Sequence, residues 1–278
     1  MTDQTYPFAD LSLARRLENA EAHGNVLFIE ARARAFPDSG AEWIEIAGTH
    51  AMFDGIGSPV SQAFGLGISQ PITSSDLETI EHFFQDRGAD VFHEVSPLAD
   101  PSTFGLLTER GYRPMEFTNV LFRPISSDLR LSVAPNEKIE VHLRTPEEKI
   151  VWSETALQGW SEFPELMDFL SDMGQVHAQS ESLGFLATLD AKPIATGMMV
   201  IHGGVGLLAG ASTIPEARRQ GAQLALLEYR LRYAADQGCD IAMIATLPGS
   251  ASQRNAERHG FRIAYTRIKW QLANPNRG

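Results

Sequence analysis

The sequence is poor in cysteine and in metal-binding patterns. Cys239 is the only cysteine among 278 residues, so an internal disulfide is excluded. A single thiol at the start of an apolar run is an ordinary core residue and suits a reducing compartment, and we expect a cytoplasmic protein. The eight histidines form no His-x-x-x-His pair and there is no Cys-x-x-Cys pair, so we expect no metal site.

Positive charge and membrane-like segments are also scarce. The sequence has 23 Lys and Arg residues against 35 Asp and Glu residues, a net charge of −12, so we expect no nucleic-acid partner. Residues 1–16 contain no apolar stretch of signal-peptide length. The uncharged run at 194–211 is interrupted by glycines and by His202-Gly203-Gly204, which favours two β-strands over a membrane helix.

The sequence does contain a strand, a basic loop and a helix in succession. Residues 206–213 are apolar and short, residues 224–235 have a strong helical pattern, and two arginines and Gly221 lie between them. The first N–H groups of a helix bind phosphate well, and glycine lets the backbone approach an anion closely. Arginine adds charge and forked donors. We therefore predict a phosphate or pyrophosphate site at residues 218–223.

The loop lacks the spacing and lysine of a Walker A loop and the spacing of a Gly-x-Gly-x-x-Gly dinucleotide loop. It resembles the Gln/Arg-x-x-Gly-x-Gly/Ala loop of the GNAT superfamily of N-acetyltransferases, which holds the pyrophosphate of acetyl-coenzyme A. Arg218 takes the first position and Gly221 the fourth. Gln223 stands at the sixth position, where the family has Gly or Ala, and this departure places a side chain near the phosphates.

The order of elements around the loop resembles a GNAT domain. Strands are expected at 139–144, at 183–190 and within 194–211, and a helix from Pro146 to Trp160. After the loop helix come a strand at 240–247, a helix from Ser250 to His259 and a strand at 261–270. The Ser-x-x-Asn spacing of Ser252 and Asn255 and the closing Gly260-Phe261 are similar to the second half of such a domain.

A weak internal repeat extends the resemblance to the N-terminal half. Residues 87–90 resemble 237–240, and residues 109–113 resemble 258–262. The first copy predicts a helix at 75–87, capped by Ser75 and Glu78, a strand at 91–95, a helix at 101–110 and a strand at 115–122.

We therefore expect a mixed α/β (α+β) protein of two tandem GNAT-like modules, each a mostly antiparallel twisted sheet flanked by helices. The domains are predicted at 1–130 and 131–278, joined by the polar segment 126–137, and the length and the 43% hydrophobic content allow two cores. At the position of the basic loop the N-terminal module has 70–75, without arginine or glycine. We expect that this module has lost cofactor binding and serves as a partner surface or a wall of the acceptor cleft.

The resemblance implies acetyl-CoA as cosubstrate, with its pantetheine arm beside the strand that precedes the loop. Candidate backbone groups for that arm are Ala211, Ser212, Thr213 and Ile214. Arg218 and Arg219, with the N–H groups of Gln220, Gly221, Ala222 and Gln223, are candidates for the pyrophosphate. Ser252 and Asn255 are further candidates, the alternatives being a helix cap for Ser252 and a solvated surface position for Asn255.

No catalytic acid or base is assigned. Many relatives use a tyrosine four residues before the Gly of Gly-Phe, and here that residue is Ala256. Tyr265 is interpreted as structural. Glu154, Glu162 and His177 come from the region that varies with the acceptor, and each is interpreted as a surface group rather than a catalyst. The aromatic-rich segment 152–173 either shapes the acceptor site or packs two helices onto the sheet.

Two hypotheses follow from the resemblance. The first is an acyl-CoA-dependent N-acyltransferase that acts on an amine of a small molecule or peptide, and the acidic net charge is compatible with a cationic acceptor. The second is a non-catalytic acyl-CoA-binding sensor or assembly module, which the absent tyrosine and the divergent N-terminal module favour. We prefer the first, without a membrane partner, and a homodimer is compatible with it. A nucleotide-phosphate protein that shares only the strand, loop and helix is a third, weaker reading.

Overall fold

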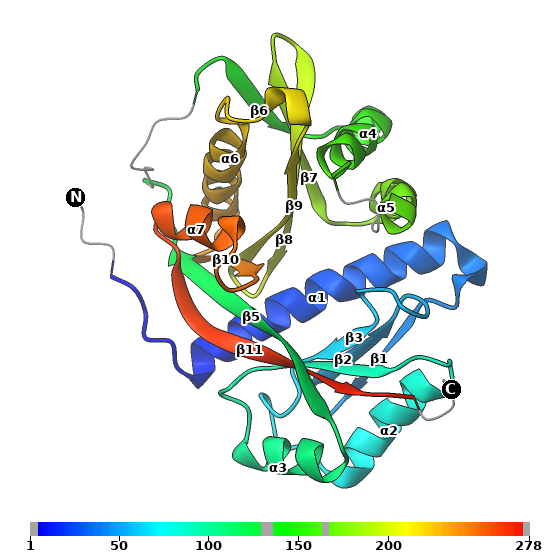
Figure 1. The fold of residues 1–278 in the computed structure, drawn as a ribbon. Helices are drawn as coiled ribbons and strands as arrows, with labels where there is room; N and C mark the ends of the chain where they lie inside the picture. The colour runs from blue at the N-terminus through cyan, green and yellow to red at the C-terminus, as the bar shows by residue number, and fades with distance from the viewer. Residues whose placement is uncertain (1–4, 129–135, 163–166, 275–278) are drawn as a thin grey trace. The chain divides into compact units, whose positions relative to one another are not determined.

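The computed structural model describes residues 5–128, 136–162 and 167–274. The chain divides into two compact units (Figure 1). Unit 1 comprises Met1–Phe122 and Ala245–Gly278, and unit 2 comprises Arg123–Ile244. Residues from 245 onward, which follow unit 2 in the sequence, thus pack with the N-terminal half. The division at residue 130 follows the sequence repeat, and as a domain boundary it stays a prediction, as does the joining role of 126–137, of which 129–135 lie outside the described residues.

The sheet of unit 1 is antiparallel except for one pair. Its strands are β1 (Glu42–Ile46), β2 (Thr49–Phe53), β3 (Gln62–Phe64), β4 (Val91–Val95), β11 (Arg262–Leu272) and β5 (Arg113–Pro124), in that spatial order. β3 and β4 are the parallel pair, joined at Ala63–His93 and Phe64–Glu94. β11 pairs antiparallel with β4 on one side and with β5 on the other. The last strand of the chain therefore lies inside the sheet of unit 1.

Helices and a buried apolar cluster complete unit 1. The helices are α1 (Leu11–Ala35), the 3-10 turn η1 (Pro37–Ser39), α2 (Ser74–Gln85), α3 (Pro101–Glu109) and α7 (Ala251–Arg258). The core joins Leu77, Ile80 and Phe84 of α2 to Val91 and Val95 of β4. α1 was not predicted, although Asp10 caps it by accepting a hydrogen bond from the N–H of Leu13 and its buried residues include Leu13 and Leu17.

The cap of α2 differs from the prediction. Thr73, not Ser75, is the N-cap: its hydroxyl accepts a hydrogen bond from the N–H of Asp76 at 3.2 Å. The Asp76 carboxylate in turn accepts from the N–H of Thr73 at 3.0 Å. Two Ser/Thr-x-x-acid patterns overlap here, and the helix starts at the earlier one, where Thr73 and Asp76 form a reciprocal capping box.

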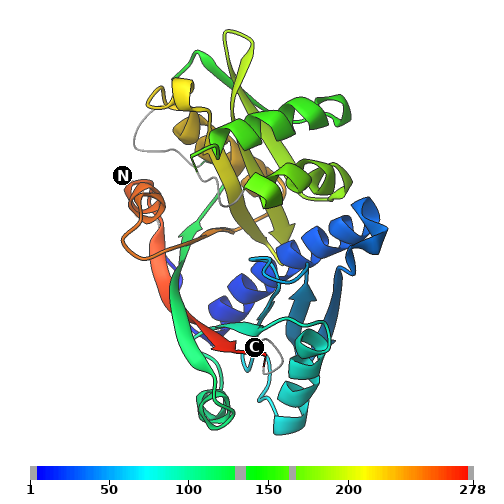
Figure 2. The ribbon, with the colours of Figure 1, turned by 45° about the vertical axis from the view of Figure 1, so that its right-hand side comes forward.

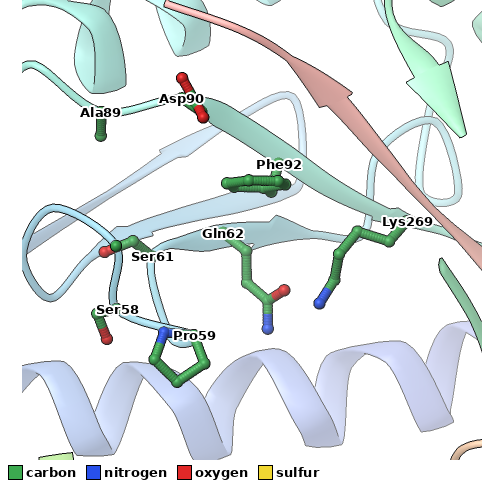
Figure 3. A pocket seen from close by; sticks show the side chains of 9 residues that line it. Ser58, Pro59, Ser61, Gln62, Ala89, Asp90, Phe92 and Lys269 are labelled. Atoms are coloured by element: carbon green, nitrogen blue, oxygen red, sulfur yellow. The ribbon is translucent and has the colours of Figure 1, made fainter. Parts of the chain in front are cut away.

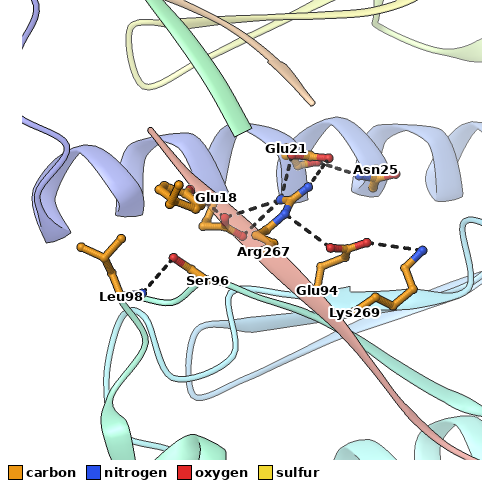
Figure 4. Close-up of polar contacts among 9 residues, drawn as sticks. Glu18, Glu21, Asn25, Glu94, Ser96, Leu98, Arg267 and Lys269 are labelled. Carbon is orange, nitrogen blue, oxygen red and sulfur yellow. Dashed lines mark hydrogen bonds and ion pairs between the residues drawn. The ribbon is translucent and has the colours of Figure 1, made fainter. Parts of the chain in front are cut away.

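A buried network of charges lies where α1, β4 and β11 meet (Figure 4). Arg267 is 1% exposed and contacts Glu21 at 2.8 Å and Glu18 and Glu94 at 3.4 Å each. Tyr265 donates its hydroxyl to Glu18 at 2.7 Å, which makes it a structural residue of unit 1. Burial, partly offset by the charge of Arg267, raises the pKa of Glu18 from 4.5 to about 7.

The sheet of unit 2 has the spatial order β10-β9-β8-β7-β6. β6 (Ile139–Leu143), β7 (Leu183–Leu189), β8 (Lys192–His202) and β9 (Val205–Thr213) are antiparallel neighbours, whereas β10 (Ile241–Thr246) is parallel to β9. η2 (Pro146–Glu148), α4 (Lys149–Gly159) and α5 (Met167–Gln179) lie on one face (Figure 2). η4 (Pro215–Ala217) and α6 (Ala222–Asp236) follow β9, and α6 covers the other face.

The predicted fold class is confirmed, and the elements predicted around the basic loop are present within a few residues of the expected bounds. The uncharged run 194–211 forms parts of β8 and β9, joined at Gly203-Gly204, where both glycines have positive φ. Within the part of the chain that the structure describes, no helix is long and apolar enough to cross a membrane.

Candidate cofactor site

The candidate site begins where β9 and β10 separate. Their parallel pairing covers Val205–Leu207 and Ile241–Met243 and then stops. β9 continues to Thr213, so its edge from Leu208 onward faces the side from which β10 has diverged. We call this segment the open edge of β9. Unpaired backbone groups on such an edge can pair with an extended ligand.

A β-bulge interrupts β9 on this edge. The register with β8 shifts between the pairs Met198–Ala209 and Thr196–Ser212, which leaves Gly210 and Ala211 without a register partner. Gly210 has a φ of 56°, a left-handed conformation that glycine adopts without strain. The bulge thus changes the direction of the backbone groups next to Ala211.

The loop after β9 leads directly into the start of α6. Gly221 is the N-cap of α6 and has a φ of 96°, and among the described residues no side chain caps the first turn. Arg219 is exposed and also has a positive φ of 64°. Outside the loop, the Asn136 amide donates to the carbonyl of Gln220 at 3.0 Å. The N–H groups of Ala222 and Gln223 therefore begin a helix whose end carries a partial positive charge.

Two side chains of the motif are engaged within unit 2. Arg218 forms an ion pair with Glu162 at 2.6 Å and contacts the carbonyls of Gly159 and Thr213 at 3.3 and 3.4 Å. Gln223, the departure from the family pattern, donates its amide to the Thr213 hydroxyl at 2.8 Å. The Gln223 side chain is thus directed back to the end of β9. Arg219 is the loop arginine that forms no ion pair with a described residue.

The four residues proposed for the pantetheine arm differ in their backbone use. The N–H of Ile214 donates to Ile194 and its carbonyl accepts from Ala217, each at 3.0 Å, so both groups are occupied. The Ser212 hydroxyl is directed toward α4, 3.3 Å from the Ala156 carbonyl. A Cβ at Gly159 would lie 2.4 Å from that hydroxyl oxygen, so α4 approaches β9 closely only because residue 159 is glycine.

Ser252 and Asn255 lie on α7, which belongs to unit 1, whereas the loop and β9 belong to unit 2. Both are exposed. Ser250, not Ser252, caps α7 by accepting from the N–H of Gln253 at 3.1 Å. Their assignment to the cofactor stays a prediction.

The acid and base candidates do not converge on the loop. Glu154 is exposed, and Glu162 reaches the loop only through its ion pair with Arg218. His177 is 4% exposed, and its ring packs edge-on against Trp152 at 5.4 Å. Trp152 is buried and donates to the carbonyl of Phe185, so this part of the aromatic segment packs the helices onto the sheet. Residues 163–166 of that segment lie outside the described residues.

Three residues near the site were not predicted. Asn136 is one amide in a polar segment and Gly159 is a glycine near the end of a helix. Neither is marked by a sequence pattern. Arg230 did give one, because the spacing 226, 230, 234 places it on the buried stripe of α6.

A separate pocket lies in unit 1 (Figure 3). It has a volume of about 260 Å³, and Gln62, Phe92 and Lys269 line it together with the 57–61 loop. Lys269 is already paired with Glu94 at 3.3 Å and with Glu116 at 3.4 Å. Across residues 5–128, 136–162 and 167–274 no group of three potential metal ligands occurs.

Comparison with known proteins supports the fold and the family. The model of the acetyltransferase (GNAT) family matches residues 147–261, which include α4 and the start of α6. A comparison with curated proteins gives no match.

Several solved structures are similar over most of the chain. A GCN5-related N-acetyltransferase from Kribbella flavida has a TM-score of 0.61 at 19% identity, over 90% of this chain and 94% of that one. A tandem GNAT protein from the clavulanic acid biosynthesis pathway has a TM-score of 0.58 at 12% identity, over 98% of each chain. A GCN5-related N-acetyltransferase from Sphaerobacter thermophilus has a TM-score of 0.52 at 17% identity, over 76% and 71%. Residues 147–261 therefore match the acetyltransferase (GNAT) family, and the chain has a fold similar to that of tandem GNAT proteins.

Proposed function

We propose that this protein is an acyl-CoA-dependent N-acyltransferase that uses acetyl-CoA and transfers the acyl group directly to an amine of a small molecule or peptide. The observation that carries the proposal is the continuity, within unit 2, of the open edge of β9 with the uncapped start of α6. The open edge of β9 can pair with an extended chain that contains amides, and the start of α6 can bind an anion. Coenzyme A has both groups, an amide-containing pantetheine arm and a pyrophosphate.

The residues of unit 2 fit that cosubstrate. The N–H groups of Gly221, Ala222 and Gln223 and the charge of Arg219 would bind the pyrophosphate. Backbone groups of Ala211 to Thr213 would pair with the pantetheine arm, whereas Ile214 would not, because its N–H and carbonyl are occupied. Arg218 would shape the loop through Glu162 and Gly159, not by contact with phosphate.

Unit 1 offers a contrasting helix start. The Asp76 carboxylate occupies the N-terminus of α2 through its hydrogen bonds to Thr73. Those bonds lower the pKa of Asp76, so it carries its negative charge at neutral pH. A fixed carboxylate repels a phosphate at that position, which supports the proposal that the N-terminal module does not bind the cofactor.

The reaction would join the amine nitrogen to the acyl carbon, break the carbon–sulfur bond and transfer the proton of the amine to solvent or to the departing thiolate. Holding the two reactants together supplies much of the rate enhancement. His177 and Tyr265 are buried, and residue 256 is an alanine, which cannot transfer a proton. We therefore propose that water relays the proton from the amine.

Acetyl-CoA binding is tested by thermal unfolding with and without the ligand. Acetyl-CoA at a hundred times its dissociation constant is expected to add roughly 2.7 kcal/mol to the free energy of unfolding. Gly221→Asp should abolish that shift, because it adds negative charge and forces a residue with a Cβ to a φ of 96°. Gly238→Asp is the matched control: it lies at the other end of α6, has a φ of 83° and is exposed, and it should keep the shift.

The outcomes separate the hypotheses. A shift in the parent and in Gly238→Asp but not in Gly221→Asp supports the site, and thiol release in an amine screen then supports the transferase. Binding without thiol release from any amine would favour an acyl-CoA sensor. No shift in the parent would refute the proposed function.

A further inference from the structure

Arg230 is a buried cation on the face of α6 that covers the sheet of unit 2. It is 3% exposed, and its guanidinium donates to three backbone carbonyls: Met198 at 3.0 Å, Leu226 at 3.2 Å and Ala209 at 3.3 Å. It forms no ion pair with any described carboxylate. Arg232 of the same helix is different, because it is exposed and paired with Glu228.

Packing of the apolar stripe does not explain this arginine. A buried charge without a counter-ion destabilises a fold unless hydrogen bonds offset the loss of water, and a leucine or methionine would fill the same stripe without that loss. Burial lowers the pKa of Arg230 to about 10, so the group is still charged at neutral pH. The positive charge of Arg230 therefore polarises the backbone carbonyls that it contacts.

The guanidinium lies against the bulge of β9. Met198 and Ala209, two of its acceptors, form the last regular pair before the register shift. A Cβ at Gly197 would lie 3.0 Å from the guanidinium carbon, so the guanidinium packs closely against the glycine opposite the bulge. Arg230 therefore holds β8 and β9 together at the point where Gly210 leaves the register.

The Ala209 carbonyl and the Gly210 N–H belong to one peptide group. That peptide is trans, so the Gly210 N–H points away from the Arg230 guanidinium that the Ala209 carbonyl contacts. A carbonyl that accepts a hydrogen bond from a cation is polarised, and the N–H on the other side of the peptide becomes a stronger donor. Gly210 is four residues from Ile214, or roughly 13 Å along the strand, on the path proposed for the pantetheine arm.

We infer that Arg230 is a positioning residue for acyl transfer: it fixes the bulge and strengthens the Gly210 N–H as a donor to the acyl carbonyl oxygen. The inference rests on the proposed function. When the amine attacks, the π electrons of the carbonyl move to that oxygen, which becomes an oxyanion. The thiolate leaves when they return and the carbon–sulfur bond breaks. A donor fixed beforehand at the oxygen favours the charged intermediate over the thioester.

The carbonyl stretching band of bound acetyl-CoA, labelled with carbon-13 at the carbonyl, tests the inference. The band of acetyl-CoA bound to the parent protein should lie at lower frequency than the band of free acetyl-CoA in a water-free solvent, because the hydrogen bond weakens the carbonyl double bond. Arg230→Met removes the charge at similar volume, and the band should move back toward higher frequency. Arg232→Met, the matched control on the same helix, should leave the band unchanged. Arg230→Lys keeps the charge and should retain part of the shift.

Affinity provides a second readout. Free coenzyme A has no acyl carbonyl, so its dissociation constant should be the same in the parent and in Arg230→Met. The dissociation constant of acetyl-CoA should rise about fivefold in that variant, the change expected for loss of one ordinary hydrogen bond.

The possible results are distinct. An unchanged carbonyl band in Arg230→Met that binds acetyl-CoA would overturn the role of Arg230 and leave the proposed function standing. Equal weakening of both ligands would show a purely structural role and overturn the inference. Absence of acetyl-CoA binding in the parent would refute the proposed function and, with it, this inference. If Arg230→Met does not fold, Arg230→Lys decides the test. A carbonyl band in Arg230→Lys at the same frequency as in the parent protein overturns the inference.

Discussion

At the scale of single residues, buried charges in this protein are held in two ways. Arg267 has three carboxylates around it, and Tyr265 adds a hydrogen bond to one of them. Among the described residues, Arg230 has only backbone carbonyls as hydrogen-bond partners. Burial raises the pKa of Glu18, the most buried of these carboxylates, and the neighbouring charges of Glu21 and Glu94 add to that shift.

Glu18 should make stability depend on pH. Its pKa is about 7 in the folded protein and near 4.5 when unfolded, so the folded state binds more protons between these values. The contribution of Glu18 to the free energy of unfolding is therefore complete below pH 4.5 and is lost as the pH rises through 7. The loss is roughly 3 kcal/mol at most. Glu18→Gln, which cannot ionise, should gain stability relative to the parent between pH 5 and pH 8.

Urea unfolding of both proteins at the two pH values measures this difference. Glu78→Gln on the exposed side of α2 serves as the control and should show no such trend. An equal stability difference at pH 5 and pH 8 for Glu18→Gln would show that Glu18 is ionised throughout.

At the scale of elements, the start of a helix decides whether it can bind an anion. α6 begins with a glycine and no side-chain cap, whereas α2 begins with a reciprocal box of Thr73 and Asp76. The same element thus has an open start in one module and a closed start in the other. The difference lies in short-range sequence, because caps involve residues three apart.

Thr73→Ala should destabilise the protein by about 1 kcal/mol, because α2 loses the hydroxyl that accepts from Asp76. Ser75→Ala, the substitution at the cap predicted from the sequence, should change stability by less than about 0.5 kcal/mol. Thermal unfolding of the two variants distinguishes the caps. A larger loss in Ser75→Ala would mean that the helix begins two residues later in solution.

At the scale of the whole molecule, the C-terminal strand belongs to the N-terminal unit. β11 pairs with β4 over five residues, from Ile268 to Leu272, and along β5 from Arg262 to Gln271. It also carries Arg267, which completes the charge network of α1 and β4. A sheet that lacks an inner strand leaves two edges unpaired and its carboxylates without their cation.

A fragment of residues 1–124 should therefore not fold, as judged by circular dichroism and cooperative thermal unfolding. The same fragment joined to residues 245–278 through a flexible Gly/Ser linker of about ten residues should fold, since it contains all of unit 1. Cooperative unfolding of the shorter fragment would show that β11 is dispensable for this unit.

Much of the fold was predictable because it depends on local patterns. Apolar alternation and glycine turns predicted strands β6 to β11. The basic loop before an apolar helix predicted the candidate phosphate site. α1 was missed because its 25 residues have an apolar face diluted by alanine and by charged residues. Gln223 and Arg218 were predicted at the phosphates. The partner of Gln223 is Thr213 at the end of the preceding strand, and the partner of Arg218 is Glu162, which is distant in sequence and reaches the loop only through folding.

The sequence by itself determined the tandem fold class, the position of the loop and the absence of a second cysteine, because each depends on residue types and short spacings. The tertiary structure decided which helix start is open, where β9 separates from β10, and that β11 lies within unit 1. It also placed the charge of Arg230 against the bulge. These features depend on contacts between residues far apart in the chain, which a local pattern does not specify.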